Sequence, residues 1–486
     1  MRLTKILCGV DYSCDSFEDI EISDITYNSR LAQSGMCFVC LTGTSVDGHK
    51  FAPDAYERGC RCFFVERRLD LPNDCIQIVT EDTRRTLALI SANLFEHPSR
   101  EMKIIGITGT KGKTTVAHIV KMFIEAAGEM CGIIGTVGVA YGDVKLKTVN
   151  TTPESYELQR LFRDMLNVGC KYCVIEASSL GLKMHRTDAI EFETGVFTNL
   201  SPDHIGTIEH PTFEDYKNSK KLLFGMCKHI VYNKDDPAYE DMLENTEADT
   251  VSFGLSNADI TAESIELYSD KDFLGVSFDC KDFSESYHID AALPGQFNAY
   301  NILAAVGVCK TLGINAKSYA ERLKNFRIPG RAEVIRVSED FQVIIDYAHN
   351  GLSLHSILTT LKQYPHNRLI ALFGSIGEKN ETRREGLGIA AGQDADLSIL
   401  TSYNPGRENP IKIAEEIAGY IRQVGGNYTI IADRREAVHY ALSIMQKGDI
   451  LLLAGKGDET SMKLGDKTVP YSEREEVEKY IKSLSE

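Results

Sequence analysis

Short apolar runs separated by turns fill the first hundred residues. Four of these runs have the length and the β-branched or aromatic content of strands. An apolar pattern with helical spacing follows over residues 83–95 and stops at His97-Pro98-Ser99, which we interpret as a linker. The predicted strands are residues 24–30, 35–41, 60–66 and 75–80.

The pattern changes at Lys103. A buried-strand run over residues 103–108 leads through a glycine-rich turn into a helical pattern over residues 114–127. Further strand-like runs alternate with helical stretches, as expected of a parallel sheet with crossover helices. These runs cover residues 131–137, 172–178 and 194–200.

The pattern changes again at Ile328-Pro329-Gly330-Arg331, after which strands and helices alternate anew. The first helix of this stretch is predicted over residues 353–363. Three α/β domains are therefore expected, and the chain length of 486 residues agrees with a usual domain size of about 150 residues. The strands predicted in the last domain are residues 341–347, 368–374, 397–402, 428–432 and 449–455.

Charge and hydropathy exclude several functional classes. The chain has 53 Lys and Arg against 70 Asp and Glu, a net charge of −17, which argues against binding to a nucleic-acid backbone. No apolar run reaches the roughly 18 residues of a membrane span. Residues 1–10 do not form the apolar core of a signal peptide, so the sequence predicts a cytoplasmic protein.

The chain has 13 cysteines, and two pairs of them have C-x-x-C spacing. Zinc or redox chemistry is one interpretation of such spacing. The pairs Cys37 and Cys40, and Cys170 and Cys173, lie inside apolar runs. The simpler interpretation is therefore that these thiols pack as small hydrophobic groups in the core.

The sharpest chemical feature is the segment GITGTKGKTT at residues 106–115, between a predicted strand and a predicted helix. Backbone N–H groups of such a turn hold phosphate oxygens, Lys113 can reach the terminal phosphates, and the Thr114 hydroxyl can bind Mg²⁺. The common P-loop pattern would have glycine at Ile107. The ATP-binding residues predicted here are Gly109, Thr110, Lys111, Gly112, Lys113, Thr114 and Thr115.

The form T-G-T-x-G-K-T-T is the variant seen in Mur ligases, and the chain resembles that family over nearly its whole length. The segments VIEASSLGLKMHR, VFTNLSPDH, EDYKNSKKLLF, LPGQFNAYNILAA, IPGRAE, IDYAH and AGKGDE occur in the family's order. The chain is most similar to the members that add the third residue of the peptidoglycan stem peptide. This resemblance implies a UDP-substrate-binding domain (1–99), a central P-loop ATPase-like domain (100–328) and a Rossmann-like amino-acid-binding domain (329–486).

The resemblance also implies an ADP-forming amide ligase of peptidoglycan precursor synthesis, and so of cell wall biogenesis, cell shape and cell division. The D-glutamate γ-carboxylate of UDP-MurNAc-L-Ala-D-Glu would attack the γ-phosphate of ATP, and the amine of a free amino acid would then attack the resulting acyl phosphate. Two alternatives stay open. A Mur-type ligase can be diverted to another carboxylate and amine, as in folylpolyglutamate synthetases, and a non-catalytic switch would bind ATP without joining anything.

The resemblance implies Lys113, Glu176, His204 and Lys220 as catalytic residues, with Mg²⁺ held by Thr114, Glu176, His204 and Lys220. Lys220 matches the lysine that Mur ligases carry as a carbamate, a CO₂ adduct that turns a cation into a metal-binding carboxylate. Without the resemblance, Glu176 could equally cap a helix and Lys220 could lie on a solvated helix face.

Other positions match the family's substrate contacts. Residues around the nucleotide are Asn301, Arg331, Asp346 and His349. Residues that hold the UDP-linked substrate are Ser29, Thr44, Ser45, Val46, Asn150, Thr151, Thr152, Ser178 and Arg186. Residues around the incoming amino acid are Lys379, Tyr403, Asn404, Gly406, Arg407, Gly455, Asp458 and Glu459.

The amino-acid selector departs from the family pattern. Diaminopimelate enzymes usually have Asp-Asn-Pro-Arg where this chain has Tyr403-Asn404-Pro405-Gly406, so the guanidinium that would clamp a second carboxylate is missing. Asp458 and Glu459 put two acids where an ammonium would neutralise them. The sequence therefore favours a dibasic amino acid such as lysine or ornithine. Meso-diaminopimelate is second, if Arg407 substitutes for the missing arginine, and a small neutral amino acid is third.

Overall fold

The computed structural model describes residues 1–15, 17–43, 46–203, 205–206, 209–269, 274–283, 285–335, 337–378 and 381–485, without the side chains of residues 381, 382, 484 and 485. The described chain divides into two compact units. The first consists of Met1–Thr261 and Tyr300–Tyr319, and the second of Ala262–Ala299 and Ala320–Glu486.

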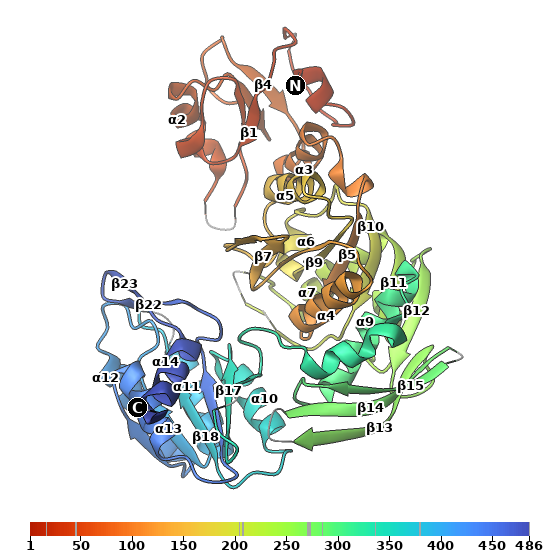
Figure 1. Cartoon of the computed structure of the whole chain (residues 1–486). Helices are drawn as coiled ribbons and strands as arrows, with labels where there is room; N and C mark the ends of the chain where they lie inside the picture. Colours follow the sequence, from red (N-terminus) through yellow and green to blue (C-terminus); the bar gives the residue numbers. More distant parts are fainter. Residues whose placement is uncertain are drawn as a thin grey trace. The chain divides into compact units, whose positions relative to one another are not determined.

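The first unit begins with a parallel four-stranded sheet whose strands follow chain order (Figure 1). Its elements are α1 (Leu3–Ile6), β1 (Asp24–Thr26), β2 (Met36–Val39), α2 (Ala52–Glu57), β3 (Cys62–Val65), β4 (Ile76–Val79) and α3 (Thr83–Leu94). The Asp82 carboxylate caps α3 by accepting hydrogen bonds from the backbone N–H groups of Arg84 and Arg85. The four predicted strands and the helix are confirmed, but the first strand ends at Thr26 and residues 29–30 of its predicted range lie in a 3₁₀ helix. Helices α1 and α2 were not predicted.

A larger sheet follows in the same unit, with the order β12-β11-β10-β5-β9-β6-β7-β8. The strands from β12 to β6 are parallel, and β7 and β8 extend the sheet antiparallel. The strands are β5 (Lys103–Thr108), β6 (Cys131–Gly135), β7 (Gly138–Tyr141), β8 (Val144–Leu146), β9 (Tyr172–Glu176), β10 (Phe192–Phe197), β11 (Cys227–Asn233) and β12 (Asp249–Gly254). The helices are α4 (Lys113–Ala126), α5 (Ser155–Asn167), α6 (Ser179–Lys183), α7 (Phe213–Lys221), α8 (Tyr239–Met242) and α9 (Phe297–Leu312).

The pairing of the central strands sets the position of the chemical residues. Ile107 of β5 lies opposite Glu176 of β9, and Thr108 lies opposite Phe197 of β10. The loops that leave these three strands therefore begin at one edge of the sheet, the carboxyl edge, where open α/β sheets bind ligands. The strands predicted at residues 103–108, 131–137, 172–178 and 194–200 are confirmed.

The second unit contains a sheet with the order β16-β17-β21-β18-β19-β20, in which only β16 is antiparallel. Helices α10, α11 and α12 pack on one face, and α13 and α14 pack on the other. The strands are β16 (Glu333–Ile335), β17 (Gln342–Asp346), β18 (Leu369–Phe373), β19 (Leu397–Leu400), β20 (Tyr428–Ile430) and β21 (Ile450–Ala454). The helices are α10 (Gly351–Leu361), α11 (Glu381–Asp394), α12 (Pro410–Gln423), α13 (Arg434–Ser443) and α14 (Glu473–Ser485).

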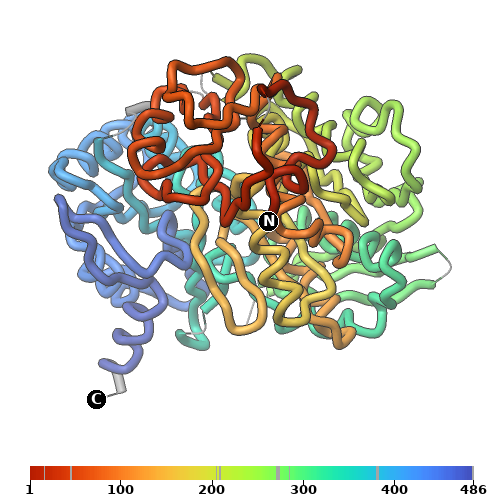
Figure 2. The backbone as a smooth tube through the Cα atoms, turned by 90° about the horizontal axis from the view of Figure 1, so that it is seen from above, coloured from red at the N-terminus to blue at the C-terminus, as the bar shows by residue number. Residues whose placement is uncertain are grey.

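This arrangement confirms the predicted Rossmann-like fold and its five strands. Helix α10 begins two residues before the predicted start, because the Asn350 side chain caps it by accepting a hydrogen bond from the Ser353 N–H. Figure 2 shows α14 running out to the carboxyl end of the chain. The remaining strands of the unit are β14 (Leu274–Asp282), β15 (Glu285–Ala291), β22 (Ser461–Leu464) and β23 (Lys467–Pro470), and β13 (Ile260–Ser269) begins in the first unit.

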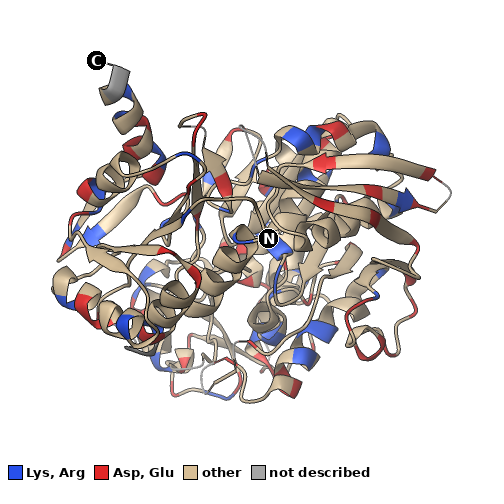
Figure 3. Ribbon diagram, turned by 90° about the horizontal axis from the view of Figure 1, so that it is seen from below, with Lys and Arg blue, Asp and Glu red and all other residues tan. Residues whose placement is uncertain are grey.

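The cysteines and the surface charges fit a protein with several apolar cores. Cys37, Cys40, Cys170 and Cys173 are buried free thiols, and burial raises the pKa of Cys173 well above its usual value. They pack in the cores, as the simpler interpretation of their spacing predicted. Figure 3 shows acidic and basic residues spread over the helices, strands and loops of the chain. Within the described ranges, no helix combines the length and the apolar character needed to cross a membrane.

Candidate active site

The phosphate loop lies between β5 and α4, and its shape requires two glycines. Gly109 and Gly112 have φ values of +147° and +86°, which side chains other than hydrogen rarely adopt. A Cβ on Gly109 would also overlap Thr198 Oγ1, and one on Gly112 would overlap Asn301 Oδ1. The predicted nucleotide residue Asn301 therefore does lie against the loop.

Bonds to the segment after β10 hold the same loop in place. Asn199 accepts hydrogen bonds from Thr110 N through its backbone oxygen and from Lys111 N through Oδ1, both at 2.9 Å. Thr110 Oγ1 donates to the backbone oxygen of Ser201 at 3.1 Å. These bonds within the chain fix the shape of the loop.

Two lysine side chains converge on one carbonyl oxygen of this loop. Lys113 Nζ donates to Gly109 O at 2.9 Å and to Thr110 O at 3.1 Å, and Lys220 Nζ donates to Gly109 O at 2.9 Å. Lys220 is only 1% exposed, with its Nζ 4.5 Å from the centre of the Tyr216 ring. Burial, and then the positive charge of Lys113, hold the pKa of Lys220 well below its usual value. Lys220 is thus a buried amine and does not lie on a solvated helix face.

Glu176 ends β9 and points its carboxylate toward the start of α4. The carboxylate accepts hydrogen bonds from Thr114 Oγ1 at 2.9 Å, Thr136 N at 3.0 Å and Thr136 Oγ1 at 3.1 Å. It is 1% exposed, and a Cβ on Gly135 would fill its space. Glu176 therefore caps no helix. Its nearest predicted partner is Thr114, and Thr136 was missed because nothing in its own sequence context marks it.

The carboxylate and hydroxyl beside the phosphate loop suit a hard cation such as Mg²⁺, which prefers oxygen ligands. A Lys220 ammonium does not suit that cation, whereas a carbamate on the same nitrogen would. His204 lies outside the described residues. Among those that are described, no three His, Cys, Asp or Glu side chains gather in a metal-binding group.

Several predicted UDP-substrate residues meet beside Glu176. Thr152 Oγ1 donates to the backbone oxygen of Glu176 at 2.8 Å and lies 3.0 Å from Ser178 Oγ. Arg186 Nη1 donates to Thr152 O at 2.9 Å, and Nη2 pairs with Glu154 at 2.9 Å. Arg186 Nε is buried and makes no hydrogen bond within the described chain.

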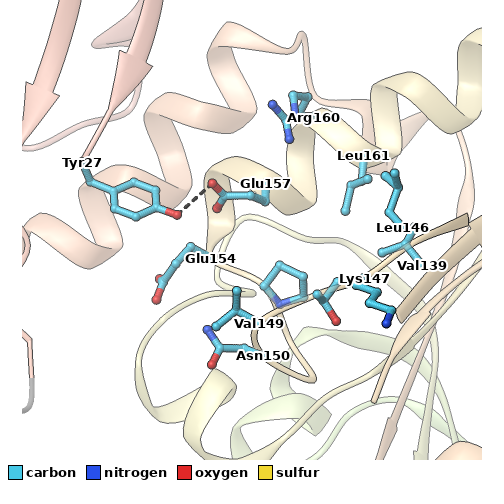
Figure 4. Close-up of a pocket in the computed structure, with 12 residues that line it drawn as sticks. Tyr27, Val139, Leu146, Lys147, Val149, Asn150, Glu154, Glu157, Arg160 and Leu161 are labelled. Atoms are coloured by element: carbon cyan, nitrogen blue, oxygen red, sulfur yellow. Dashed lines mark hydrogen bonds between the residues drawn. The ribbon is translucent and has the colours of Figure 1, made fainter. Parts of the chain in front are cut away.

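Thr151 and Asn150 continue this segment away from Glu176. Thr151 Oγ1 lies 3.2 Å from Thr136 Oγ1, and Asn150 lines a cavity of about 250 Å³ (Figure 4). On the first-domain side the cavity is lined by Tyr27, whose hydroxyl donates to Glu157 at 2.8 Å. Burial raises the pKa of Glu157 above its usual value. Tyr27 and Glu157 were not predicted, since only the fold brings them together.

The other predicted residues of the first domain are placed as follows. Ser29 begins a short 3₁₀ helix over Ser29–Leu31, two residues after Tyr27, and Val46 is exposed. Thr44 and Ser45 lie outside the described residues.

In the second unit, the predicted nucleotide residues cluster around the end of β17. The two oxygens of Asp346 accept hydrogen bonds from Ala332 N at 2.7 Å and Ala348 N at 2.8 Å, and burial raises its pKa. The Arg331 guanidinium lies over the Tyr347 ring, 5.4 Å from its centre. His349 Nδ1 lies 2.8 Å from Tyr347 O, and burial lowers the pKa of this histidine.

The Glu459 carboxylate connects three loops at the carboxyl edge of this sheet. It accepts hydrogen bonds from the hydroxyls of Tyr347 at 3.2 Å and Tyr403 at 3.5 Å, and from Asn404 Nδ2 at 3.5 Å. Lys456 Nζ, fully buried, pairs with it at 2.5 Å. Lys456 therefore already pairs with one of the two acids expected to attract a substrate ammonium, and the role of Glu459 in amino-acid binding stays a prediction.

Several other residues predicted around the incoming amino acid also bond to groups within the chain. The Arg407 guanidinium pairs with Asp466 at 2.8 Å, and both side chains are exposed. Asn404 Oδ1 accepts a hydrogen bond from Lys463 N at 2.9 Å. Gly455 N donates to Asp346 O at 3.0 Å, and Asp458 is exposed. Lys379 lies outside the described residues.

A P-loop sheet together with a Rossmann-like sheet defines a nucleotide-binding α/β enzyme, and comparison with known proteins identifies its family. The Mur ligase family, catalytic domain, matches residues 21–94, the Mur ligase middle domain residues 107–309, and the Mur ligase glutamate ligase domain residues 330–457. The chain belongs to the Mur ligase family.

Similar proteins include diaminopimelate ligases that match the chain over its full length. The chain is 38% identical to the UDP-N-acetylmuramoyl-L-alanyl-D-glutamate–2,6-diaminopimelate ligase of Clostridium botulinum, over 100% of both chains. It is 37% identical to the enzyme of the same name from Caldanaerobacter subterraneus, over 99% of both chains. A solved structure of a protein with this name has a TM-score of 0.70 and 27% identity, and covers 97% of this chain and 98% of its own. MurF from Acinetobacter baumannii shares the fold, with a TM-score of 0.62 at 20% identity over 93% of this chain and 95% of its own.

Proposed function

We propose that the chain adds the third amino acid to UDP-MurNAc-L-Ala-D-Glu at the expense of ATP. The full-length relatives are named for this UDP-linked acceptor. The observation that carries the proposal is a hydrogen-bonded chain that links Thr114 of the phosphate loop through Glu176 to Thr152, Ser178 and Arg186. Such a chain suits a site where ATP and an anionic acceptor meet.

In this proposal the phosphate loop and Lys113 bind the phosphates of ATP. Lys113 would turn from the Gly109 carbonyl to the γ-phosphate, and the backbone N–H groups of Gly112 to Thr115 would face the other phosphate oxygens. Thr114, Glu176 and His204 would hold Mg²⁺, which supplies positive charge to the transferring phosphoryl group. The acceptor carboxylate attacks the γ-phosphate, ADP leaves, and the incoming amine then displaces phosphate from the acyl carbon.

We propose that Lys220 works as a carbamate. Burial and Lys113 favour its neutral amine, and the lone pair of that amine can attack CO₂, releasing a proton and leaving a carboxylate on the nitrogen. That carboxylate would sit at the phosphate loop and serve as a further oxygen ligand for Mg²⁺.

The UDP-linked substrate would be held by both domains of the first unit. We assign Ser29, Thr44, Ser45 and Val46 to the uridine diphosphate, as the family resemblance implies. Asn150, Thr151, Thr152, Ser178 and Arg186 would hold the diphosphate and muramoyl peptide. We propose domain boundaries at 1–99, 100–328 and 329–486, and a cytoplasmic location because the reaction consumes ATP.

The second unit would supply nucleotide contacts through Arg331, Asp346 and His349, and Asn301 would add one from the first unit. We propose a diamino acid as the third substrate, with Lys379 near its α-carboxylate. The names of the relatives favour diaminopimelate. The absence of a side chain at Gly406, and the pairing of Arg407 with Asp466, favour lysine or ornithine.

Hydroxylamine tests this function without any choice of amino acid. It is a small nucleophile that captures acyl phosphates as hydroxamates. Incubation with ATP, Mg²⁺ and UDP-MurNAc-L-Ala-D-Glu should give a UDP-linked hydroxamate and one phosphate per hydroxamate. ATP turnover that does not depend on the UDP-linked acceptor would instead support a nucleotide switch, and turnover with another carboxylate would support a diverted ligase.

A further inference from the structure

Loops after β17, β18, β19 and β21 meet at the carboxyl edge of the second unit's sheet. Glu459 joins three of them, because its carboxylate bonds Tyr347, Tyr403 and its own loop's Lys456. Glu378 joins the fourth, since its carboxylate accepts a hydrogen bond from Arg407 N at 3.1 Å. Ligands of open α/β sheets bind at this edge.

The Glu378 carboxylate occupies the space that a side chain at position 406 would need. A Cβ on Gly406 would lie 2.9 Å from Glu378 Oε2. Gly406 has a φ of +59° and Glu378 a φ of +60°, a conformation that costs a residue with a side chain about 1 kcal/mol or more. The Glu378 carboxylate therefore lies beside Gly406, where the Cβ of a longer residue would begin.

Neighbouring groups fix this loop. Glu378 N donates to Glu408 Oε2 at 2.9 Å, and the buried Arg384 pairs with the same carboxylate oxygen at 2.7 Å. Arg384 Nη1 also pairs with Glu416 at 2.6 Å. The backbone that carries Glu378 is therefore anchored to α11 and α12, and its exposed carboxylate is preorganised.

Two of the acids in these loops, Glu459 and Glu378, differ in their charge balance. Lys456 neutralises Glu459, and the Arg407 guanidinium is engaged by Asp466. Within the described parts of the chain, no cation pairs with Glu378. A negative charge at this point attracts an ammonium group and repels a carboxylate.

We propose that Glu378 determines specificity for the amino acid by receiving the distal ammonium of a diamino monocarboxylic acid, of the lysine and ornithine class, and by repelling a second carboxylate. This inference rests on the proposed function and specifies the class of amino acid that the enzyme adds. Diaminopimelate is then a disfavoured substrate, because the carbon that bears its distal ammonium also bears a carboxylate.

Competition between lysine, ornithine and meso-diaminopimelate at equal concentration, followed by the mass of the UDP-linked product, tests the inference. Hydroxamate formation, measured in parallel, tests the proposed function alone. We expect hydroxamate in all variants and a lysine or ornithine product in the unaltered enzyme. Hydroxamate together with a preference for diaminopimelate would overturn the role of Glu378 while leaving the proposed function intact. Absence of hydroxamate would overturn both.

Two substitutions separate charge from structure. Glu378→Gln keeps an oxygen that can accept from Arg407 N but removes the charge, so KM for lysine or ornithine should rise about fivefold, the scale of one exposed ion pair, with kcat little changed. Glu378→Lys should shift the competition toward diaminopimelate by about tenfold or more. Glu415→Gln, which removes an exposed acid from α12, is the matched control and should change neither value. Equal KM values for Glu378→Gln and the unaltered enzyme would refute the proposal.

Discussion

Lys113 and Lys220 share one hydrogen-bond acceptor, the carbonyl oxygen of Gly109. Two ammonium groups so close repel each other, and the buried one also loses its hydration. Both effects favour the neutral form of Lys220. A buried neutral amine beside a phosphate-binding loop has a chemical use, because only that form reacts with CO₂.

This pKa shift has a consequence for stability. The pKa of Lys220 in the folded protein lies below the usual 10.5, so between these two pKa values the unfolded chain binds more protons than the folded one. Without the carbamate, stability should therefore rise as the pH increases toward about 10.5. Lys220→Met should remove this rise. Denaturant midpoints measured across alkaline pH in CO₂-free buffer check it, and parallel curves for both proteins would contradict the shift.

A second prediction concerns the activity supported by Lys220. Lys220→Ala should lose most ligation, since the proposed carbamate ligand disappears, and short-chain carboxylates such as acetate should restore part of it. Lys221→Ala is the control, because Lys221 pairs at the surface with Asp241 and Glu244. Full activity of Lys220→Ala, or an unmodified lysine in the mass of active enzyme, would argue against the carbamate.

Lys113→Ala should abolish ligation while the fold remains. Lys113 donates to the loop carbonyls of Gly109 and Thr110, and removing charge from a transferring phosphoryl group costs at least about a hundredfold in rate. Phosphate release and circular dichroism measure the two properties separately. The exposed Lys447→Ala should behave as the unaltered enzyme, and normal turnover by Lys113→Ala would remove the phosphate-loop assignment.

At the scale of elements, the buried strands were predictable because their apolar runs are continuous and end in turns. Helices α1 and α2 have four and six residues, too few for a helical period to stand out. Strands β7 and β8 are short and lie at an edge of their sheet. Residues of such edge strands are buried to different degrees, so the apolar pattern in their sequence is weak.

The candidate site likewise has parts that local sequence predicts and parts that only the fold brings together. The glycine positions of the phosphate loop follow from local sequence, since turn geometry and phosphate binding both act over a few residues. Lys456 and Glu459 lie in one sequence motif. The hydrogen bonds that Glu459 accepts from Tyr347 and Tyr403, however, come from two other loops, which only the fold brings together. The contact of Glu378 with Gly406 likewise exists only once β18 and β19 are side by side.

Arg434 connects elements of the second unit. Its guanidinium pairs with Glu473 at the start of α14 and donates to the backbone oxygens of Ser402, after β19, and Ala454, at the end of β21. The arginine and the glutamate are both fully buried. The side chain therefore anchors two loops of the edge where the amino acid is proposed to bind.

Arg434→Ala should lower the free energy of unfolding by about 3–5 kcal/mol, because it leaves the Glu473 carboxylate buried without a partner. Arg435→Ala is the matched control: it removes the next arginine, whose side chain is 43% exposed, and should cost within about 1 kcal/mol. Urea unfolding followed by circular dichroism measures both. Equal losses in the two variants would show that burial of the Arg434 pair is not what stabilises this unit.

For the whole molecule, the account divides the reaction between the two units. The first holds the phosphate loop, the proposed metal ligands and the proposed acceptor contacts, and the second carries the loops proposed to select the amine. Activation of the acceptor and choice of the amine should therefore respond to different substitutions. Changes at Lys113 or Lys220 should reduce hydroxamate formation, whereas changes at Glu378 should leave it and alter only the amino acid incorporated.

The most direct test of the central claim measures phosphate release and product mass together. Reactions contain ATP, Mg²⁺, UDP-MurNAc-L-Ala-D-Glu and one amino acid at a time. The account predicts one phosphate for each UDP-linked product, a product heavier by one diamino acid residue, and no release when the UDP-linked acceptor is omitted. Phosphate release without that acceptor, or no ligated product with any amino acid, would contradict it.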